Sequence, residues 1–199
     1  MRKAFFTLTV VAVFMATSVF AQVTGETEVG SDGRIEGFLS QYVLIDWKEI
    51  NVLARYFYVI GKVNRGELAI GPTISLGPTT AKLQIGGTTD KQLMMSTLVA
   101  THLFGRGIMY IFDTKSRHGP EHHQEIYQKL WVALDREGMV LFRYEDSVVG
   151  GRHMFVRLGF ENSYRIDDKA YFFVAPFYDL VKKNVGAQTG IRFGLNRDR

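Results

Sequence analysis

Three histidines lie close together in one polar segment of the chain. His118, His122 and His123 stand near Glu121 and Glu125. Imidazole and carboxylate groups of this kind bind Zn²⁺ or Cu²⁺, but the spacing corresponds to no specific site such as His-Glu-x-x-His. We interpret the segment as a solvated loop with weak candidate ligands, and we predict neither a metal nor another cofactor.

Hydrolytic chemistry would require a nucleophile, a base and an orienting acid. Ser147, Asp146 and His153 form such a triad on paper, but any chain with this many Ser, Asp and His residues permits that. The chain has no Gly-x-Ser-x-Gly elbow, P-loop or dinucleotide fingerprint, and no basic stripe interleaved with aromatic residues. We therefore predict that the protein is not an enzyme and has no nucleic-acid partner.

Composition and the N-terminus indicate a single exported domain. Of 199 residues, 46% are hydrophobic and 22% charged, which is too apolar for a disordered chain and too polar for a bundle of membrane helices. Arg2, Lys3 and the apolar stretch that follows are typical of a signal peptide, which we assign to residues 1–21 with cleavage near Ala21. The chain has no cysteine, so no disulfide stabilises the exported product.

The mature chain is a succession of strand-like runs. Gly, Pro, Asn and Asp punctuate runs of mostly about 8 to 12 residues rich in Val, Ile, Thr, Tyr and Phe, and no long segment has a helical period. Within 68–76, for example, Leu68 and Ile70 alternate with Ala69 and Gly71. Such a period of two places each set on one face of a sheet, so we predict an all-β, antiparallel, up-and-down fold.

Alternation alone leaves open which face is inside. A soluble barrel turns its apolar face inward, whereas a transmembrane barrel turns it towards lipid and fills its lumen with small and charged residues. Mixed charged and small residues on the polar faces and aromatic residues near strand ends favour the second arrangement. The predicted lumen-lining residues are Lys82, Glu125, Lys129, Arg143, Glu145, Arg157, Glu161 and Arg192.

The last run carries a recognisable pattern. Residues 188–195 read Gln-Thr-Gly-Ile-Arg-Phe-Gly-Leu, with Gln188, Gly190, Phe193 and Leu195 at the informative positions. This resembles the C-terminal insertion signal of small bacterial outer-membrane β-barrel proteins, although the chain continues for four residues where those proteins usually end on an aromatic residue. The resemblance implies a porin-like transmembrane barrel in a Gram-negative cell envelope, with outer-membrane lipid and the barrel-assembly machinery as partners.

The expected barrel has about ten strands. Single-chain bacterial barrels have an even number of strands, and the runs in 52–195 supply ten. Residues 22–51 would then form an N-terminal extension or one more strand, and 196–199 a tail. Twelve strands is the alternative. Pro72 and Pro176 lack a ladder donor, so we expect bulges or strand ends at both.

Two functions are compatible with a charged lumen. The protein is either a narrow channel, whose slight excess of lumen cations would favour anions among small solutes, or a structural scaffold whose ion pairs close the lumen. A lipid-modifying outer-membrane enzyme is a further alternative. The competing fold is a soluble, lipocalin-like exported barrel that binds an apolar ligand.

Overall fold

A computed structural model of the chain describes residues 22–31, 37–47, 49–59, 63–103, 107–118, 123–136 and 139–195. The predicted signal peptide and the tail at 196–199 lie outside these residues. No helix of the described part is long and apolar enough to cross a membrane.

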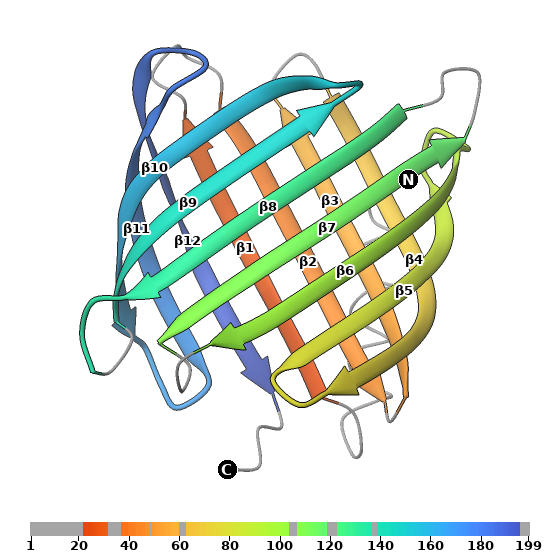
Figure 1. Cartoon of the computed structure of the whole chain (residues 1–199), viewed down its shortest axis with the longest axis horizontal. Coiled ribbons are helices and arrows are strands. Elements are labelled where there is room, and N and C mark those ends of the chain that lie inside the picture. Colours follow the sequence, from red (N-terminus) through yellow and green to blue (C-terminus); the bar gives the residue numbers. More distant parts are fainter. Residues whose placement is uncertain are drawn as a thin grey trace, which may run out of the picture.

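The described residues form twelve strands (Figure 1). The strands are β1 (Gln22–Ser31), β2 (Gly37–Trp47), β3 (Ile50–Val59), β4 (Val63–Leu76), β5 (Thr79–Thr88), β6 (Leu93–Leu103), β7 (Ile108–His118), β8 (His123–Ala133), β9 (Val140–Val149), β10 (Arg152–Arg165), β11 (Ala170–Asp179) and β12 (Asn184–Leu195).

Each strand pairs in antiparallel fashion with its neighbours in the chain, and the first strand also pairs with the last. Glu26 of β1 lies opposite Tyr42 of β2 on one side and opposite Arg192 of β12 on the other. The sheet is therefore a closed barrel without an unpaired edge. Figure 1 shows strongly tilted strands, with β5 to β10 in front and β1 to β3 behind them.

The all-β, antiparallel, up-and-down prediction is confirmed, but the prediction of ten strands is wrong and its alternative of twelve is correct. The difference arises at the N-terminus, where residues 22–47 contribute both β1 and β2. Neither segment has a clean alternation of apolar and charged residues, so the sequence pattern did not separate them. The pairing of β1 with β12 makes these two strands necessary for closure.

The two prolines do not produce the expected bulges or strand ends. Pro72 lies within β4 and Pro176 within β11, and the register is the same on both sides of each. At Pro72 the residue pairing between β4 and β5 is interrupted, and at Pro176 the pairing between β10 and β11 is interrupted. A register shift occurs instead in β10, between His153 and Phe155.

Candidate functional site: the charged interior of the barrel

The two faces of the sheet have opposite polarity. Leu68, Ile85 and Phe160 are 57%, 52% and 53% exposed on the outer face. Successive strand residues point to opposite faces, and the neighbouring side chains Glu67 and Glu161 are buried, with 4% and 0% exposure. The barrel thus has mainly apolar side chains outside and most of its charged side chains inside.

The residues that the sequence suggested for the lumen fall into two groups by burial. Six of them are buried: Lys82, Lys129, Arg143, Glu145, Arg157 and Glu161. The side chains of Glu125 and Arg192 are partly covered, with 25% and 20% exposure. Five of the eight, together with Glu26, belong to one connected cluster.

Glu161 is the centre of this cluster. Its Oε2 accepts hydrogen bonds of 2.8 Å from Arg143 Nη1 and from Arg192 Nη2, while Oε1 accepts from Arg192 Nη1 and from Ser163 Oγ. Arg192 Nε also donates to Glu26 Oε2 at 2.7 Å. A fully buried carboxylate is thereby surrounded by donors, which is the condition under which a buried charge is tolerated.

The cluster extends to β8 and β9. Lys129 Nζ lies 3.1 Å from Glu145 Oε1, and Arg143 contacts both Glu145 and Gln188. The Arg192 guanidinium of β12 stacks 4.7 Å from the ring of Trp131 in β8. Strands β9, β10 and β11 separate β8 from β12, so this contact crosses the interior.

A second cluster joins β4 to β7 and β8. Glu67 Oε1 accepts a 2.8 Å hydrogen bond from Arg117 Nη2, and Glu67 Oε2 accepts one of 3.3 Å from Lys115 Nζ. Arg117 also donates to Glu125 at 3.0 Å. The sequence analysis did not predict Glu67, Lys115 or Arg117: Glu67 directly precedes the run 68–76 that showed alternation, and Lys115 and Arg117 directly precede the histidine segment that we interpreted as a loop. The alternation of Asp113, Lys115 and Arg117 was the signal that would have extended the strand.

A third cluster lies between β2 and β5. Lys82 Nζ donates to Asp46 Oδ1 at 2.7 Å, across two intervening strands. Gln84 Nε2 donates to Asn51 Oδ1 at 2.7 Å beside it. We did not predict Asp46 as a lumen residue because it lies in residues 22–51, which we interpreted as an N-terminal extension or one more strand.

Arg157 lies opposite Glu145 in the register and also contacts aromatic rings and Asp179. Its guanidinium lies between the rings of Phe155 and Phe177, at 4.1 Å and 4.5 Å, and its Nε is 3.7 Å from Asp179 Oδ2. Cation–π contacts of this kind stabilise a desolvated guanidinium.

The buried interior charges balance among the residues that the structure describes. Six cations are buried: Lys82, Lys115, Arg117, Lys129, Arg143 and Arg157. Six buried carboxylates share the inward face with them: Glu26, Glu67, Asp113, Glu145, Glu161 and Asp179. The slight cationic excess that we inferred from the sequence is therefore wrong for the buried set, and it supplies no preference for anions.

At one rim of the barrel, Asp90 lies in the turn between β5 and β6. Partial burial raises the pKa of its carboxyl, but a hydrogen bond from Thr88 and the nearby Arg65 guanidinium outweigh that effect, so the pKa lies below its ordinary value. The Arg65 Nη2 to Asp90 Oδ2 distance is 3.0 Å.

The other chemical groupings suggested by the sequence are not assembled. Ser147 points inward, whereas Asp146 and His153 lie on the outer face, where His153 Nδ1 is 2.8 Å from Asp146 Oδ1. A strict period of two would place His153 on the same face as Arg157, but the register shift after His153 puts the two residues on opposite faces. The described residues contain no group of three or more metal-binding side chains.

The histidine segment itself is only partly described. His118 ends β7 with an exposed side chain, His122 lies outside the described residues, and only the backbone of His123 is described. The residues of the C-terminal pattern all lie in β12. Gln188 is buried and accepts from Arg143 at 2.9 Å, Phe193 pairs with Ala170 of β11, and Leu195 pairs with Val23 of β1.

Known structures with this architecture exist. The NanC porin superposes with a TM-score of 0.61 at 6% identity, covering 86% of this chain and 98% of that one. The KdgM porin superposes with a TM-score of 0.60 at 7% identity, covering 86% of this chain and 98% of that one. The fold is porin-like. Since identity is so low, this likeness concerns fold alone. Neither a family model nor a curated protein sequence matches the chain.

Proposed function

We propose that the mature protein is an integral outer-membrane β-barrel that forms a narrow channel for small polar solutes. The observation that carries this proposal is the inverted polarity of the closed sheet. In hydrocarbon every backbone N–H and C=O group must be paired, and a barrel without edges meets that requirement. Exposed Leu68, Ile85 and Phe160 suit contact with acyl chains, while the charges lie inside.

The soluble, lipocalin-like alternative finds little support in the interior. An apolar ligand needs a cavity lined mainly by apolar side chains. The interior here contains buried ion pairs such as Glu161 with Arg143 instead.

We further propose that residues 1–21 direct export and that Gln188, Gly190, Phe193 and Leu195 present the last strand to the barrel-assembly machinery. The position of these four residues in β12, which closes the barrel against β1, supports this assignment. Closure can only be completed when the last strand is in place.

The solute of the channel is proposed to be small and polar. One structure of the KdgM porin, which is similar in fold, holds disordered oligogalacturonate. In this chain the interior offers both cationic and anionic groups to a solute. A closed scaffold is the second candidate, because the contacts of Arg192 with Trp131 and of Glu67 with Arg117 cross the interior.

Two experiments test the proposal. The mature chain should fractionate with outer membranes and should migrate differently on a gel before and after boiling, whereas recovery in the aqueous fraction without detergent would refute the membrane assignment. In planar bilayers we expect single-channel conductance, and its absence with folded protein would favour the scaffold. Arg157→Ala and Arg192→Ala should each shift selectivity towards cations, whereas Lys169→Ala in an exposed turn should not.

A further inference from the structure

The outer face of the barrel is mainly apolar, but over β6, β7 and β8 a group of polar residues lies among apolar ones such as Met95 and Ile126. We define a polar stripe by its five outward residues, Thr97, Thr114, Ser116, Gln124 and Gln128. Thr97 lies directly opposite Thr114, and Ser116 lies opposite Gln124. Neighbouring inward residues such as the buried Ser96, Asp113 and Lys115 fix this orientation.

The stripe reaches the middle of the strands. Thr97 is the fifth of 11 residues in β6, Thr114 the seventh of 11 in β7, and Gln128 the sixth of 11 in β8. Away from the stripe, on the third strand beyond β8, the corresponding outward position in β11 is Val174, the fifth of 10 residues. In a membrane barrel these residues would lie near the bilayer centre.

Most of these polar side chains have no partner of their own. Among the described residues, no hydrogen bond reaches the side chains of Thr97, Thr114, Ser116 or Gln124. Gln128 Oε1 accepts from Tyr110 Oη at 2.8 Å, which leaves its amide N–H groups unused. Polar groups without partners are unfavourable in hydrocarbon, so a stripe that faced lipid would destabilise the barrel with nothing to compensate for it.

Beside the stripe, Asp146 of β9 lies opposite Gln128. Its carboxylate accepts from Tyr144 Oη at 3.4 Å and lies 2.8 Å from His153 Nδ1, and the residue is only 5% exposed. Although Asp146 lies on the outer face, Tyr144, His153 and its other neighbours cover its carboxylate, so little of the charge is presented to a molecule that approaches the stripe.

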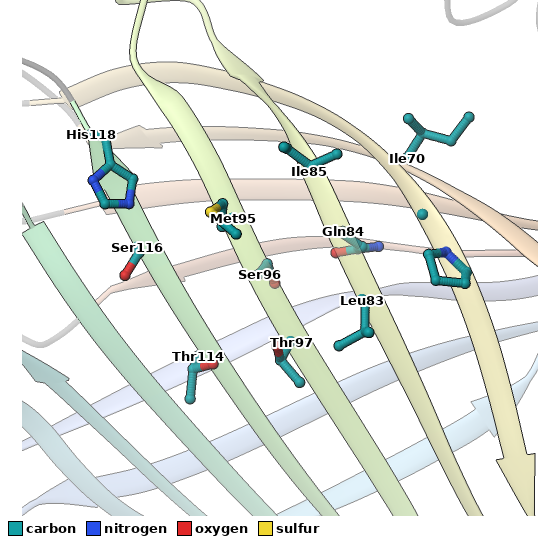
Figure 2. Close-up of a pocket in the computed structure, with 12 residues that line it drawn as sticks. Ile70, Leu83, Gln84, Ile85, Met95, Ser96, Thr97, Thr114, Ser116 and His118 are labelled. Atoms are coloured by element: carbon teal, nitrogen blue, oxygen red, sulfur yellow. The ribbon is translucent and has the colours of Figure 1, made fainter.

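The surface next to the stripe is hollowed. A groove of about 390 Å³ runs over β4 to β7, with Ile70, Leu83 and Ile85 along one side and Thr97, Thr114 and Ser116 along the other. Figure 2 shows these side chains on neighbouring ribbons, with the far wall of the barrel behind them. Small hydroxyl residues beside a groove allow close approach of another backbone.

We propose that the polar stripe is the surface through which two copies of this chain associate within the membrane, an inference that rests on the proposed membrane location. Two copies in one bilayer are related by an axis along the membrane normal, so each residue meets its counterpart at the same depth. Hydroxyl and amide groups both donate and accept, so the stripe is complementary to itself. A different partner would need a matching polar band at this depth.

Cysteine cross-linking tests this directly, because the natural chain has no cysteine. Gln128→Cys and the matched control Val174→Cys are expressed as full chains, and outer membranes are treated with a short flexible bismaleimide. We expect Gln128→Cys to give a band of twice the monomer mass and Val174→Cys to remain monomeric. Heating part of each sample reports, on the same gel, whether the barrel is folded and in the membrane.

The outcomes separate the two proposals. A chain that is absent from the membrane fraction refutes the proposed function itself. A folded, membrane-bound Gln128→Cys chain that stays monomeric, dimerises no more than Val174→Cys, or links to a protein of another mass overturns the second-copy assignment. The cysteine-free double variant Thr114→Val/Gln128→Leu should show at least a tenfold lower dimer fraction in mild detergent; an unchanged fraction also overturns the assignment.

Discussion

Removing the charge of Glu161 should strongly destabilise the barrel. Its carboxylate is fully buried and accepts from both Arg143 and Arg192. Glu161→Gln keeps the shape but leaves two guanidiniums to share Glu26 and Glu145. Breaking a buried ion pair by removing one partner costs about 3–5 kcal/mol. We expect a loss near the lower end, about 3 kcal/mol, because the remaining carboxylates compensate in part.

Urea-induced unfolding in lipid vesicles measures this loss. Trp131 lies 4.7 Å from the Arg192 guanidinium, so its fluorescence reports directly on the cluster. Glu49→Gln removes the same charge from an exposed turn and serves as the matched control. We expect a clearly lower midpoint for Glu161→Gln and an unchanged midpoint for Glu49→Gln.

A double variant separates charge from packing. Glu161→Gln/Arg143→Gln removes one charge of each sign, and it leaves Glu145 beside Lys129 at 3.1 Å and Arg192 beside Glu26 at 2.7 Å. It should therefore unfold at a higher urea concentration than Glu161→Gln alone. Equal midpoints for Glu161→Gln and the unmodified protein would refute the view that this cluster stabilises the barrel.

Two further changes probe the interior and the strand packing. Lys82→Met leaves the Asp46 carboxylate without the ammonium that lies 2.7 Å away, so the reversal potential in a salt gradient should shift towards cations, and Asp46→Asn should shift it towards anions. Gly71→Ala places a Cβ 1.8 Å from the Leu83 carbonyl oxygen and should abolish the folded band on an unheated gel. Gly87→Ala, with its nearest neighbouring atom at 3.7 Å, should retain that band, and equal behaviour of the two glycine variants would contradict the packing argument.

The fold class follows from the sequence where the alternation is clean. In 68–76 every second residue is apolar, in 185–195 every second residue except Thr189 is apolar, and both runs lie within strands of the barrel. Alternation is a local property of the extended backbone, so it can be recognised without knowing which strands pair with one another. The first two strands lack such a pattern. Their identity depends on the pairing of β1 with β12, which joins the two ends of the chain.

Long-range partners explain what the sequence could not predict about the interior. Glu67 contacts Lys115 and Arg117, about fifty residues later, only because the sheet closes and brings β4 across from β7. The expected cationic excess was wrong for a related reason. Acidic partners such as Asp46 and Glu67 lay in segments whose inward positions were not apparent before the register was known.

Besides their overall polarity, the two faces of this barrel differ in whether their polar side chains have partners. Inside, each of the carboxylates of Glu67 and Glu161 has two cations within hydrogen-bonding distance, so the interior charges can be buried together. Outside, Thr114 has no such partner among the described residues, and Gln128 has only Tyr110. If lipid surrounds the barrel, partners for these outer groups have to come from another molecule, and a second stripe at the same depth supplies them.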